Sequence, residues 1–164
     1  MYKRQSYILD LRDNPGGLFE SGINIARLWM NKGTIVYTIN RQGIQNSFSS
    51  SGKPLTNSPL VLLVNKGTAS SSEILAGALQ DSRRAILFGE TTFGKGLIQS
   101  LFELSNNCGL AVTVAKYETP NHKDIHKLGI QPDKIILQET LAYDEIGTIK
   151  DIQYQEAIKF LREK

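Results

Sequence analysis

The sequence predicts an alternating α/β domain, and two observations carry this prediction. Short runs rich in apolar and β-branched residues alternate along the chain with segments whose apolar residues recur at helical spacing. Clusters of Gly, Pro, Asn and Ser separate many of these segments, as turns and loops do in compact domains. The chain has 164 residues, of which 40% are hydrophobic and 21% charged, which is enough for one domain with a core.

The first half of the chain predicts three strands and two helices. The first helix rests on Leu18, Ile25, Leu28 and Trp29, which recur at helical spacing before a plausible C-cap at Gly33. The predicted elements are a strand over residues 6–11, a helix over 18–31, a strand over 34–39, an exposed loop over 46–58, a strand over 59–65 and a helix from about 70 to 81. The run at residues 59–65 is continuously apolar, so we expect a strand that is buried on both faces.

The second half predicts four more strands and a terminal helix. The strands cover residues 85–89, 96–104, 110–117 and 130–137, with a turn at 105–109 joining the second to the third. The terminal helix covers residues 151–162, with Ile152, Ala157, Ile158 and Leu161 facing inward. We divide the chain into residues 6–138, a core, and residues 139–164, a C-terminal extension that carries this helix.

Charge and cysteine content exclude several classes of protein. The net charge of +3, from 19 Lys and Arg against 16 Asp and Glu, is too small and too scattered to indicate a nucleic-acid partner. A single cysteine, Cys108, excludes an internal disulfide. Residues 1–5 (MYKRQ) resemble the translation of a sequencing-adapter end, and we exclude them from fold reasoning as a scar. Without Lys3 and Arg4 the charge falls to +1, and the natural chain would extend upstream.

One candidate site lies at the start of the helix predicted from residue 70. Ser70 and Glu73 form the S-x-x-E pattern of a helix capping box, which is a purely structural role. A serine where a buried strand turns into a helix also projects its hydroxyl at the carboxyl edge of the sheet. There the free N–H groups and the positive end of the helix can stabilise an oxyanion. The pattern alone does not choose between Ser70, Ser71 and Ser72.

Two further patterns lack the neighbouring residues and elements that their functions require. Residues 89–95 match G-x-x-x-x-G-K, but Gly96 supplies no hydroxyl for Mg²⁺ and a predicted strand follows, so a nucleotide site is not indicated. His122 and His126 have the i, i+4 spacing of a zinc helix, but they lie in a predicted loop without an evident third ligand. We expect no metal and no cofactor. Lys95, in contrast, is surrounded in sequence by apolar Phe93, Leu97 and Ile98.

Several motifs, taken in order, resemble the C-terminal processing peptidases, which are tail-specific serine proteases. The resemblance runs from about Tyr7 to Asp133. It rests on D-L-R-D-N-P-G-G at residues 10–17, G-T-A-S-S-S-E-I at 67–74, F-G-K-G at 93–96 with Gln99, Y-E-T-P at 117–120 and G-I-Q-P-D at 129–133. Residues 121–129 look most like the cyanobacterial and plastid branch, which matures a photosystem II subunit by trimming its C-terminus.

The resemblance implies roles for individual residues. Ser70 would be the nucleophile and Lys95, 25 residues later, the general base, with Gln99 orienting that lysine. The backbone N–H groups of Gly16 and Ser71 would bind the oxyanion, and Glu73 and Asp81 would be supporting acidic positions. Asp13 stands where the family often has asparagine, and Ser71 where it often has alanine.

The implied chemistry is coherent with the residues. A lysine must lose its proton to act as a base, and burial among apolar side chains such as Phe93, Leu97 and Ile98 disfavours the charged ammonium. Serine becomes a useful nucleophile once such a base accepts its proton, and Ser-Lys pairs do this on unrelated folds. An acyl-enzyme route then needs no metal.

The resemblance also implies an architecture and a location. It predicts a crotonase-like core with a mixed sheet and flanking helices, acting on a protein or peptide with a free C-terminus. An upstream PDZ domain would receive that C-terminus by strand addition. The parent protein would be exported, to a periplasm or a thylakoid lumen. The alternative is a catalytically inactive binding or scaffold domain of the same fold. The presence of Ser70, Lys95 and Gln99 together favours the protease.

Overall fold

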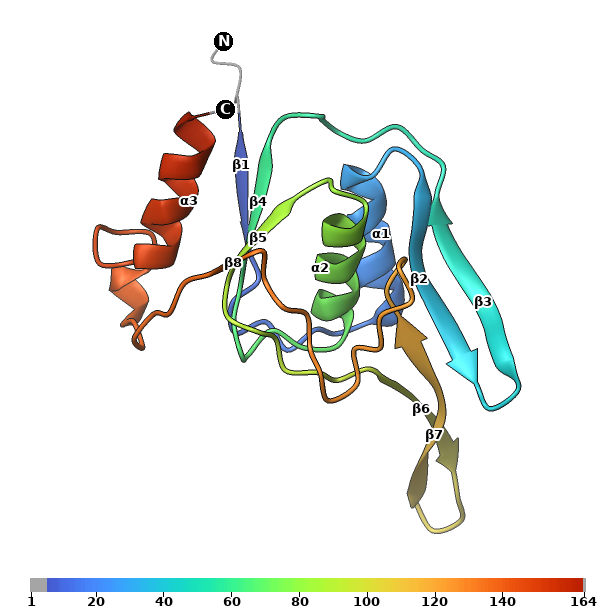
Figure 1. Cartoon of the computed structure of the whole chain (residues 1–164). Helices are drawn as coiled ribbons and strands as arrows, with labels where there is room; N and C mark the ends of the chain where they lie inside the picture. Colours follow the sequence, from blue (N-terminus) through green and yellow to red (C-terminus); the bar gives the residue numbers. More distant parts are fainter. Residues whose placement is uncertain (1–5, 164) are drawn as a thin grey trace.

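Two sheets and the helices between and beside them stack into four layers (Figure 1). The computed structural model describes residues 6–163, apart from the side chains of residues 44 and 45. The elements are β1 (Tyr7–Asp10), α1 (Phe19–Trp29), β2 (Gly33–Asn40), β3 (Gly43–Ser50), β4 (Leu60–Val64), α2 (Ser71–Asp81), β5 (Ile86–Gly89), β6 (Leu97–Glu103), β7 (Gly109–Glu118), β8 (Lys134–Ile135), the 3-10 turn η1 (Tyr143–Glu145) and α3 (Ile152–Arg162). This order confirms the predicted α/β alternation.

The first sheet is parallel, with the strand order β1-β4-β5-β8. All five residues of β4 are buried, as the apolar run predicted. Leu60, Leu62 and Val64 belong to the core shared with α1 and α2, whereas Val61 and Leu63 pack toward α3 on the other face. Parallel strands covered on both faces need such continuous apolar sequences. The predicted strand at residues 130–137 shrinks to the two residues of β8.

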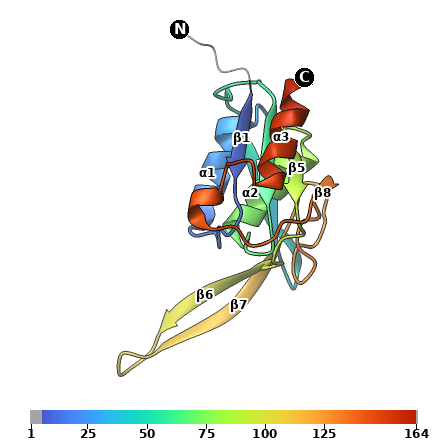
Figure 2. The same ribbon diagram turned by 90° about the vertical axis from the view of Figure 1, so that its left-hand side faces the viewer.

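The second sheet is antiparallel, with the strand order β3-β2-β7-β6. Most of β6 pairs with β7 alone, because β2 contacts only the end of β7 near Lys116–Glu118. The β6–β7 hairpin therefore extends away from the body as an arm (Figure 2). Its tip confirms the predicted turn, and Asn106 and Asn107 take the positive φ angles of 62° and 55° that asparagine tolerates in tight turns.

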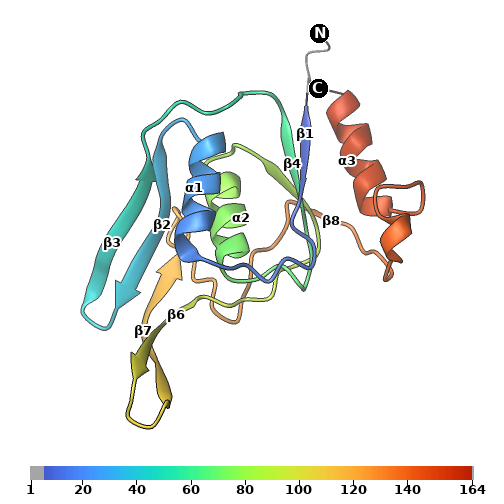
Figure 3. The same cartoon turned by 180° about the vertical axis from the view of Figure 1, so that it is seen from behind.

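The middle layer consists of α1 and α2. The two helices lie between the two sheets both from the front (Figure 1) and from behind (Figure 3). A Cβ at Gly22 of α1 would lie 2.8 Å from the Ser71 carbonyl oxygen, so this glycine permits the two helices to approach closely. Most of the residues whose spacing predicted α1 lie outside its buried face. Leu18 is 77% exposed, and Ile25 and Leu28 are also exposed. The helix instead buries Gly22, Ile23 and Ala26.

The predicted loop at residues 46–58 is wrong in its first part, because β3 continues to Ser50. The polar side chains of this strand are tolerated because β3 lies at the edge of its sheet. Phe48 anchors it by an edge-to-face contact with Phe19, whose ring centre lies 5.1 Å away. Residues 51–58 form the irregular connection to β4.

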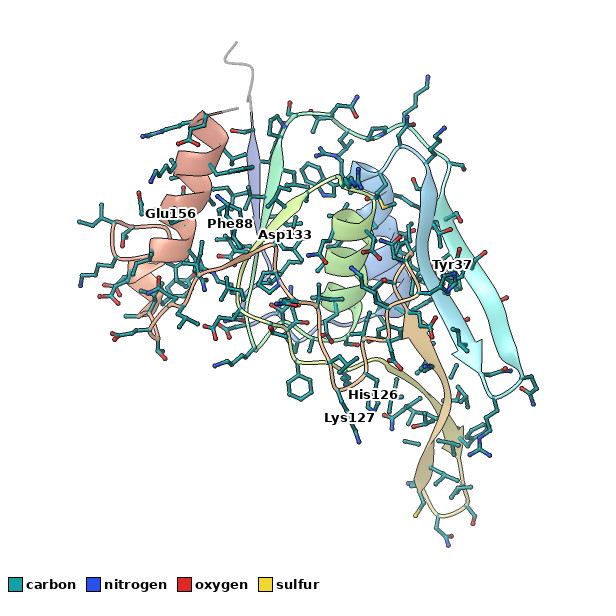
Figure 4. All side chains as sticks on the ribbon, in the orientation of Figure 1. Tyr37, Phe88, His126, Lys127, Asp133 and Glu156 are labelled. Atoms are coloured by element: carbon teal, nitrogen blue, oxygen red, sulfur yellow. The ribbon has the colours of Figure 1, made fainter. Side chains whose placement is uncertain are left out.

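The outer layer is α3, which covers the face of the first sheet opposite α1 and α2. Ala157 is buried with Phe88, which lies between the sheet and this helix (Figure 4). The prediction that Ile152 faces inward is wrong, since 52% of it is exposed. Gln153 takes the buried position because its amide donates to the Ile136 carbonyl oxygen at 2.7 Å. Within residues 6–163, no helix is long and apolar enough to cross a membrane.

Candidate active site

Ser70 is the N-cap of α2 and has a backbone conformation rarely seen outside glycine, with φ 58° and ψ −123°. Strained strand-to-helix turns of this kind expose a nucleophile at the edge of a sheet. Ser71 and Ser72 lie inside the helix and are buried. The Ser70 hydroxyl makes no capping hydrogen bond within the part of the chain that the structure describes. The predicted capping-box pair of Ser70 and Glu73 is present at this turn.

The Glu73 member of this pair is a fully buried carboxylate. Its Oε2 accepts hydrogen bonds from the backbone nitrogens of Ser70 at 2.9 Å and of Lys95 at 2.8 Å. Its Oε1 accepts from the Gly94 nitrogen at 2.7 Å and from the Thr92 hydroxyl at 2.5 Å. One carboxylate oxygen therefore joins the backbones of Ser70 and Lys95, which are 25 residues apart in the sequence.

Tyr117 of β7 gives the Lys95 backbone a second fixed contact. Its buried hydroxyl donates a hydrogen bond to the Lys95 carbonyl oxygen. Burial raises the pKa of this hydroxyl well above its usual value, the charge of Glu73 adds to the rise, and a contact with the Ser70 side chain opposes it. Tyr117 thus contacts both Ser70 and Lys95. Tyr117 belongs to the Y-E-T-P motif, but no pattern in the sequence predicts this position of its hydroxyl.

The surroundings of the Lys95 side chain differ from those expected. Lys95 is exposed, and Phe93 is 66% exposed. Leu97 and Ile98 are half-buried as β6 begins. Gln99 is exposed on β6, and within residues 6–163 no hydrogen bond joins it to Lys95. The structure therefore brings Ser70 and Lys95 together through their backbones, without an apolar enclosure of the lysine and without Gln99.

The loop that carries Gly16 lies directly against the Ser70 turn. Gly16 has φ +89°, and a Cβ there would lie 2.6 Å from the Ala69 carbonyl oxygen and 2.8 Å from the Ser71 nitrogen. Only glycine fits at this position. The Ser71 N–H is unpaired among the residues described, which suits an oxyanion donor. The Gly16 N–H instead donates to Asn14 Oδ1 at 3.0 Å. The second expected donor is therefore occupied by the side chain of its own loop.

Asp81 lies at the opposite end of α2 from Ser70, about 16 Å away along the helix axis. It accepts hydrogen bonds from the Asn121 nitrogen at 2.9 Å and from Lys123 Nζ at 3.0 Å. Burial acts to raise the pKa of Asp81, but hydrogen bonds from Thr119, Asn121 and Lys123 lower it overall. Its contacts hold residues 119–123 in place and do not reach Ser70 or Lys95.

The two histidines do not converge. The His122 ring stacks on Tyr37, with ring centres 4.4 Å apart, and its Nδ1 contacts Glu118 at 3.3 Å. His126 lies against Gly96 instead, on the segment that also carries Lys127 (Figure 4). Across residues 6–163, no three His, Cys, Asp or Glu side chains gather in a group that could hold a metal ion.

Arg12 is a residue whose contacts sequence reasoning missed. Its guanidinium reaches Asp151, which is 139 residues further along the chain. The D-L-R-D-N-P-G-G motif signalled that Arg12 lies close to the site. Nothing in the sequence pointed to a partner in the terminal helix.

A strained serine at a strand-to-helix turn, a neighbouring lysine and a free N–H group are the parts of a serine-dependent hydrolytic site. The comparisons with known proteins agree with this class. The model of "Peptidase family S41" matches residues 1–136, and the chain belongs to this family.

Named relatives share much of the sequence. The chain is 65% identical over 155 residues to a "Carboxyl-terminal-processing protease" of Synechocystis sp., covering 94% of this chain and 36% of that protein. It is 57% identical to "Carboxyl-terminal-processing peptidase 2, chloroplastic" of Arabidopsis thaliana, covering 89% of this chain and 29% of that protein. The solved structure of a "Photosystem II D1 C-terminal processing protease" matches 92% of this chain and 41% of its own, with TM-score 0.82 and 44% identity. The chain thus spans about a third of the length of these curated relatives.

Proposed function

We propose that this chain is the catalytic core of a serine endopeptidase that cleaves proteins near their C-termini. The observation that carries the proposal is the Glu73 carboxylate, whose Oε2 accepts from the backbone nitrogens of both Ser70 and Lys95. Membership of the family and the strained Ser70 backbone support it. We also propose that the core has a crotonase-like fold.

In the first half-reaction, Ser70 Oγ attacks the scissile carbonyl carbon and Lys95 Nζ, in its neutral form, accepts the serine proton. The negative charge that develops on the carbonyl oxygen faces the Ser71 N–H and the Gly16 N–H, once Asn14 releases the latter. The C–N bond then breaks, and the protonated lysine gives its proton to the leaving amine. An ester on Ser70 and a new N-terminus result.

In the second half-reaction, Lys95 accepts a proton from water, whose oxygen attacks the ester carbonyl. The ester C–O bond breaks, the proton returns to Ser70 Oγ and the acid product leaves. Each proton that lysine takes it also gives back, so lysine is regenerated. We assign no metal or cofactor to these steps.

The substrate and setting follow from the relatives. We propose a protein or peptide with a free C-terminus as substrate, and photosystem II maturation as the setting, since a matched structure is a photosystem II D1 processing protease and other relatives are chloroplastic. An upstream PDZ domain and export to a periplasm or thylakoid lumen remain predictions. An inactive scaffold domain is less favoured, because it would have no need for the strained serine beside the lysine.

Replacement of each serine tests the assignment. In the full-length protein, Ser70→Ala should abolish cleavage of a peptide with a free apolar C-terminus, whereas Ser72→Ala should retain most of it. Mass spectrometry of the rapidly quenched wild-type reaction should show the substrate acyl group on the peptide that contains Ser70. Retained cleavage in Ser70→Ala would exclude the proposed nucleophile.

A further inference from the structure

We infer that Asp151, at the start of α3, is a positioning residue for the loop that carries Gly16, and that it acts through Arg12. This inference rests on the proposed function, because it assumes that the Gly16 loop faces the reacting carbonyl group. Asp151 lies outside residues 1–136, the part matched by the family model. Its role follows from contacts in the folded chain.

Arg12 and Asp151 form a two-bond ion pair away from solvent. Arg12 Nη1 donates to Asp151 Oδ1 at 2.8 Å, and Nη2 donates to Oδ2 at 2.7 Å. The Asp151 side chain is fully buried, and only 9% of the Arg12 side chain is exposed. A guanidinium held by two parallel bonds has a defined orientation as well as a position.

Asp151 is itself fixed by its own segment. It is the N-cap of α3 and accepts from the Tyr154 nitrogen at 3.0 Å, and it also accepts from the Gly147 nitrogen at 2.9 Å. The neighbouring Gln153 accepts from Arg12 Nη1 at 3.2 Å and donates to the Ile136 carbonyl oxygen. Arg12 therefore binds a rigid acceptor that is anchored both to α3 and to the end of the first sheet.

Arg12 leads directly into the candidate oxyanion loop. The Asp13 nitrogen donates to Asn65 Oδ1 at 2.9 Å, and the Asn14 carbonyl oxygen accepts from the Ala69 nitrogen at 3.0 Å. Gly16 then meets the Ser70 turn so closely that a single methyl group would not fit. Asn14 and Gly16 follow Arg12 within four residues of the chain. A shift of Arg12 therefore displaces both the Asn14 contact with Ala69 and Gly16.

Loss of the Asp151 charge should move this loop. Arg12 Nε and Nη2 also donate to Asp10 on β1, at 2.7–3.1 Å, so a guanidinium that loses the Asp151 charge keeps Asp10 as its carboxylate partner. It then moves closer to Asp10 or turns toward solvent, and either movement pulls on the residues between Arg12 and Gly16. Small displacements of an oxyanion donor affect the chemical step more than substrate binding, because the oxyanion exists only in the transition state.

The test is Asp151→Asn in the full-length protein, because asparagine still caps α3 and keeps the volume. We expect kcat to fall about 10- to 100-fold while KM stays close to the wild-type value. Hydrogen exchange of the peptide that covers residues 11–18 should become faster, since it reports the Gly16 and Asn14 contacts without any need for activity. Arg12→Gln should give the same changes, and the double variant should lose little more than either single one.

Phe160→Leu is the matched structural control. It weakens the packing of α3 on Phe88, whose ring centre lies 5.5 Å from that of Phe160, and leaves Arg12 and Asp151 intact. With a similar loss of melting temperature, it should leave kcat and the exchange of residues 11–18 nearly unchanged. An equal fall of kcat in both variants would show a general structural role and overturn the inference, as would an Asp151→Asn protein with normal kcat and normal exchange. If the wild-type protein shows no Ser70-dependent cleavage, the proposed function fails. The exchange of residues 11–18 then decides alone whether Asp151 holds the loop.

Discussion

At the scale of single residues, Lys95 carries the most exacting requirement of the proposed chemistry. Its backbone is fixed on both sides, by Glu73 at the nitrogen and by Tyr117 at the carbonyl oxygen. Its side chain must gain and lose a proton in each half-reaction. A guanidinium cannot be deprotonated near neutral pH, so it can supply charge at this position but cannot act as a base.

We therefore expect Lys95→Arg to be as inactive as Lys95→Ala, with kcat/KM at least 10²- to 10⁴-fold below that of the wild-type protein, roughly the contribution of general base catalysis. Steady-state cleavage of a peptide with a free C-terminus measures this. Lys66→Arg is the matched control, because Lys66 is an exposed lysine paired with Glu90 at 3.1 Å, and it should retain activity. An active Lys95→Arg protein would mean that positive charge is sufficient and that lysine transfers no proton.

The sequence places the residues of the candidate site better than it predicts their surroundings. Ser70 and Glu73 could be placed because an N-cap pattern has a fixed local geometry. The exposure of Phe93 could not be predicted, because apolar neighbours in sequence do not determine how a loop turns. The hydrogen bond from the Gly16 N–H to the Asn14 side chain could not be predicted either, because it depends on the positive φ of Gly16, which no sequence pattern specifies.

At the scale of elements, contacts between segments far apart in the sequence determine the buried face of α1 and the presence of β3. The periodicity of apolar residues predicts neither. The periodicity of Leu18, Ile25, Leu28 and Trp29 predicted the helix α1 but does not mark its buried face. The close approach of α2 at Ser71 requires small residues there, so Gly22 and Ala26 are buried and Leu28 is exposed. The strand β3 was missed because an edge strand needs few apolar residues and takes its hydrogen bonds from β2.

The attachment of α3 predicts a dependence of stability on pH. Burial acts to raise the pKa of Asp151, but hydrogen bonds from Arg12, Gly147 and Tyr154 and the charge of Arg12 lower it overall. The unfolded chain has the ordinary aspartate pKa of about 3.9. The stabilisation from Asp151 is therefore complete above that value and is lost as pH falls through the lower, folded-state pKa.

We expect Asp151→Asn to lower the melting temperature at pH 7 and to have a progressively smaller effect as the pH falls below about 4. Thermal unfolding of both proteins, followed by circular dichroism from pH 7 to pH 3, measures the difference. Since Asp81 and Asp124 also have lowered pKa values, the comparison of the two proteins isolates Asp151 from those groups. A difference that stays constant down to pH 3 would contradict an ionised Asp151 as the anchor of α3.

At the scale of the whole molecule, the described chain leaves much apolar surface in water. Leu18 is exposed at the N-cap of α1, as are Ile25 and Leu28 within it. On the β6–β7 arm, Leu101, Phe102 and Leu110 are exposed. Apolar side chains that are exposed together on one element mark places where other protein surface binds. The Synechocystis relative is nearly three times as long as the stretch that it shares with this chain, and we propose that further segments of the protein cover these side chains.

The last prediction concerns residues 6–164 on their own. We expect this stretch to cleave peptides at least about 100-fold less efficiently than the full-length protein, because the remote contacts that bind and orient a substrate are not supplied by the site alone. The exposure of Lys95 supports the same expectation, because nothing in the described residues encloses its side chain in apolar surroundings. The measurement compares kcat/KM of both proteins on one unstructured peptide, with light scattering to follow aggregation from the exposed α1 and arm surfaces. The Ser70→Ala variant of each protein is the inactive control, and its rate gives the background cleavage. A soluble, monomeric stretch with the kcat/KM of the full-length protein would show that residues 6–164 complete the catalytic site unaided, whereas normal kcat with a raised KM would assign substrate capture alone to the rest of the protein.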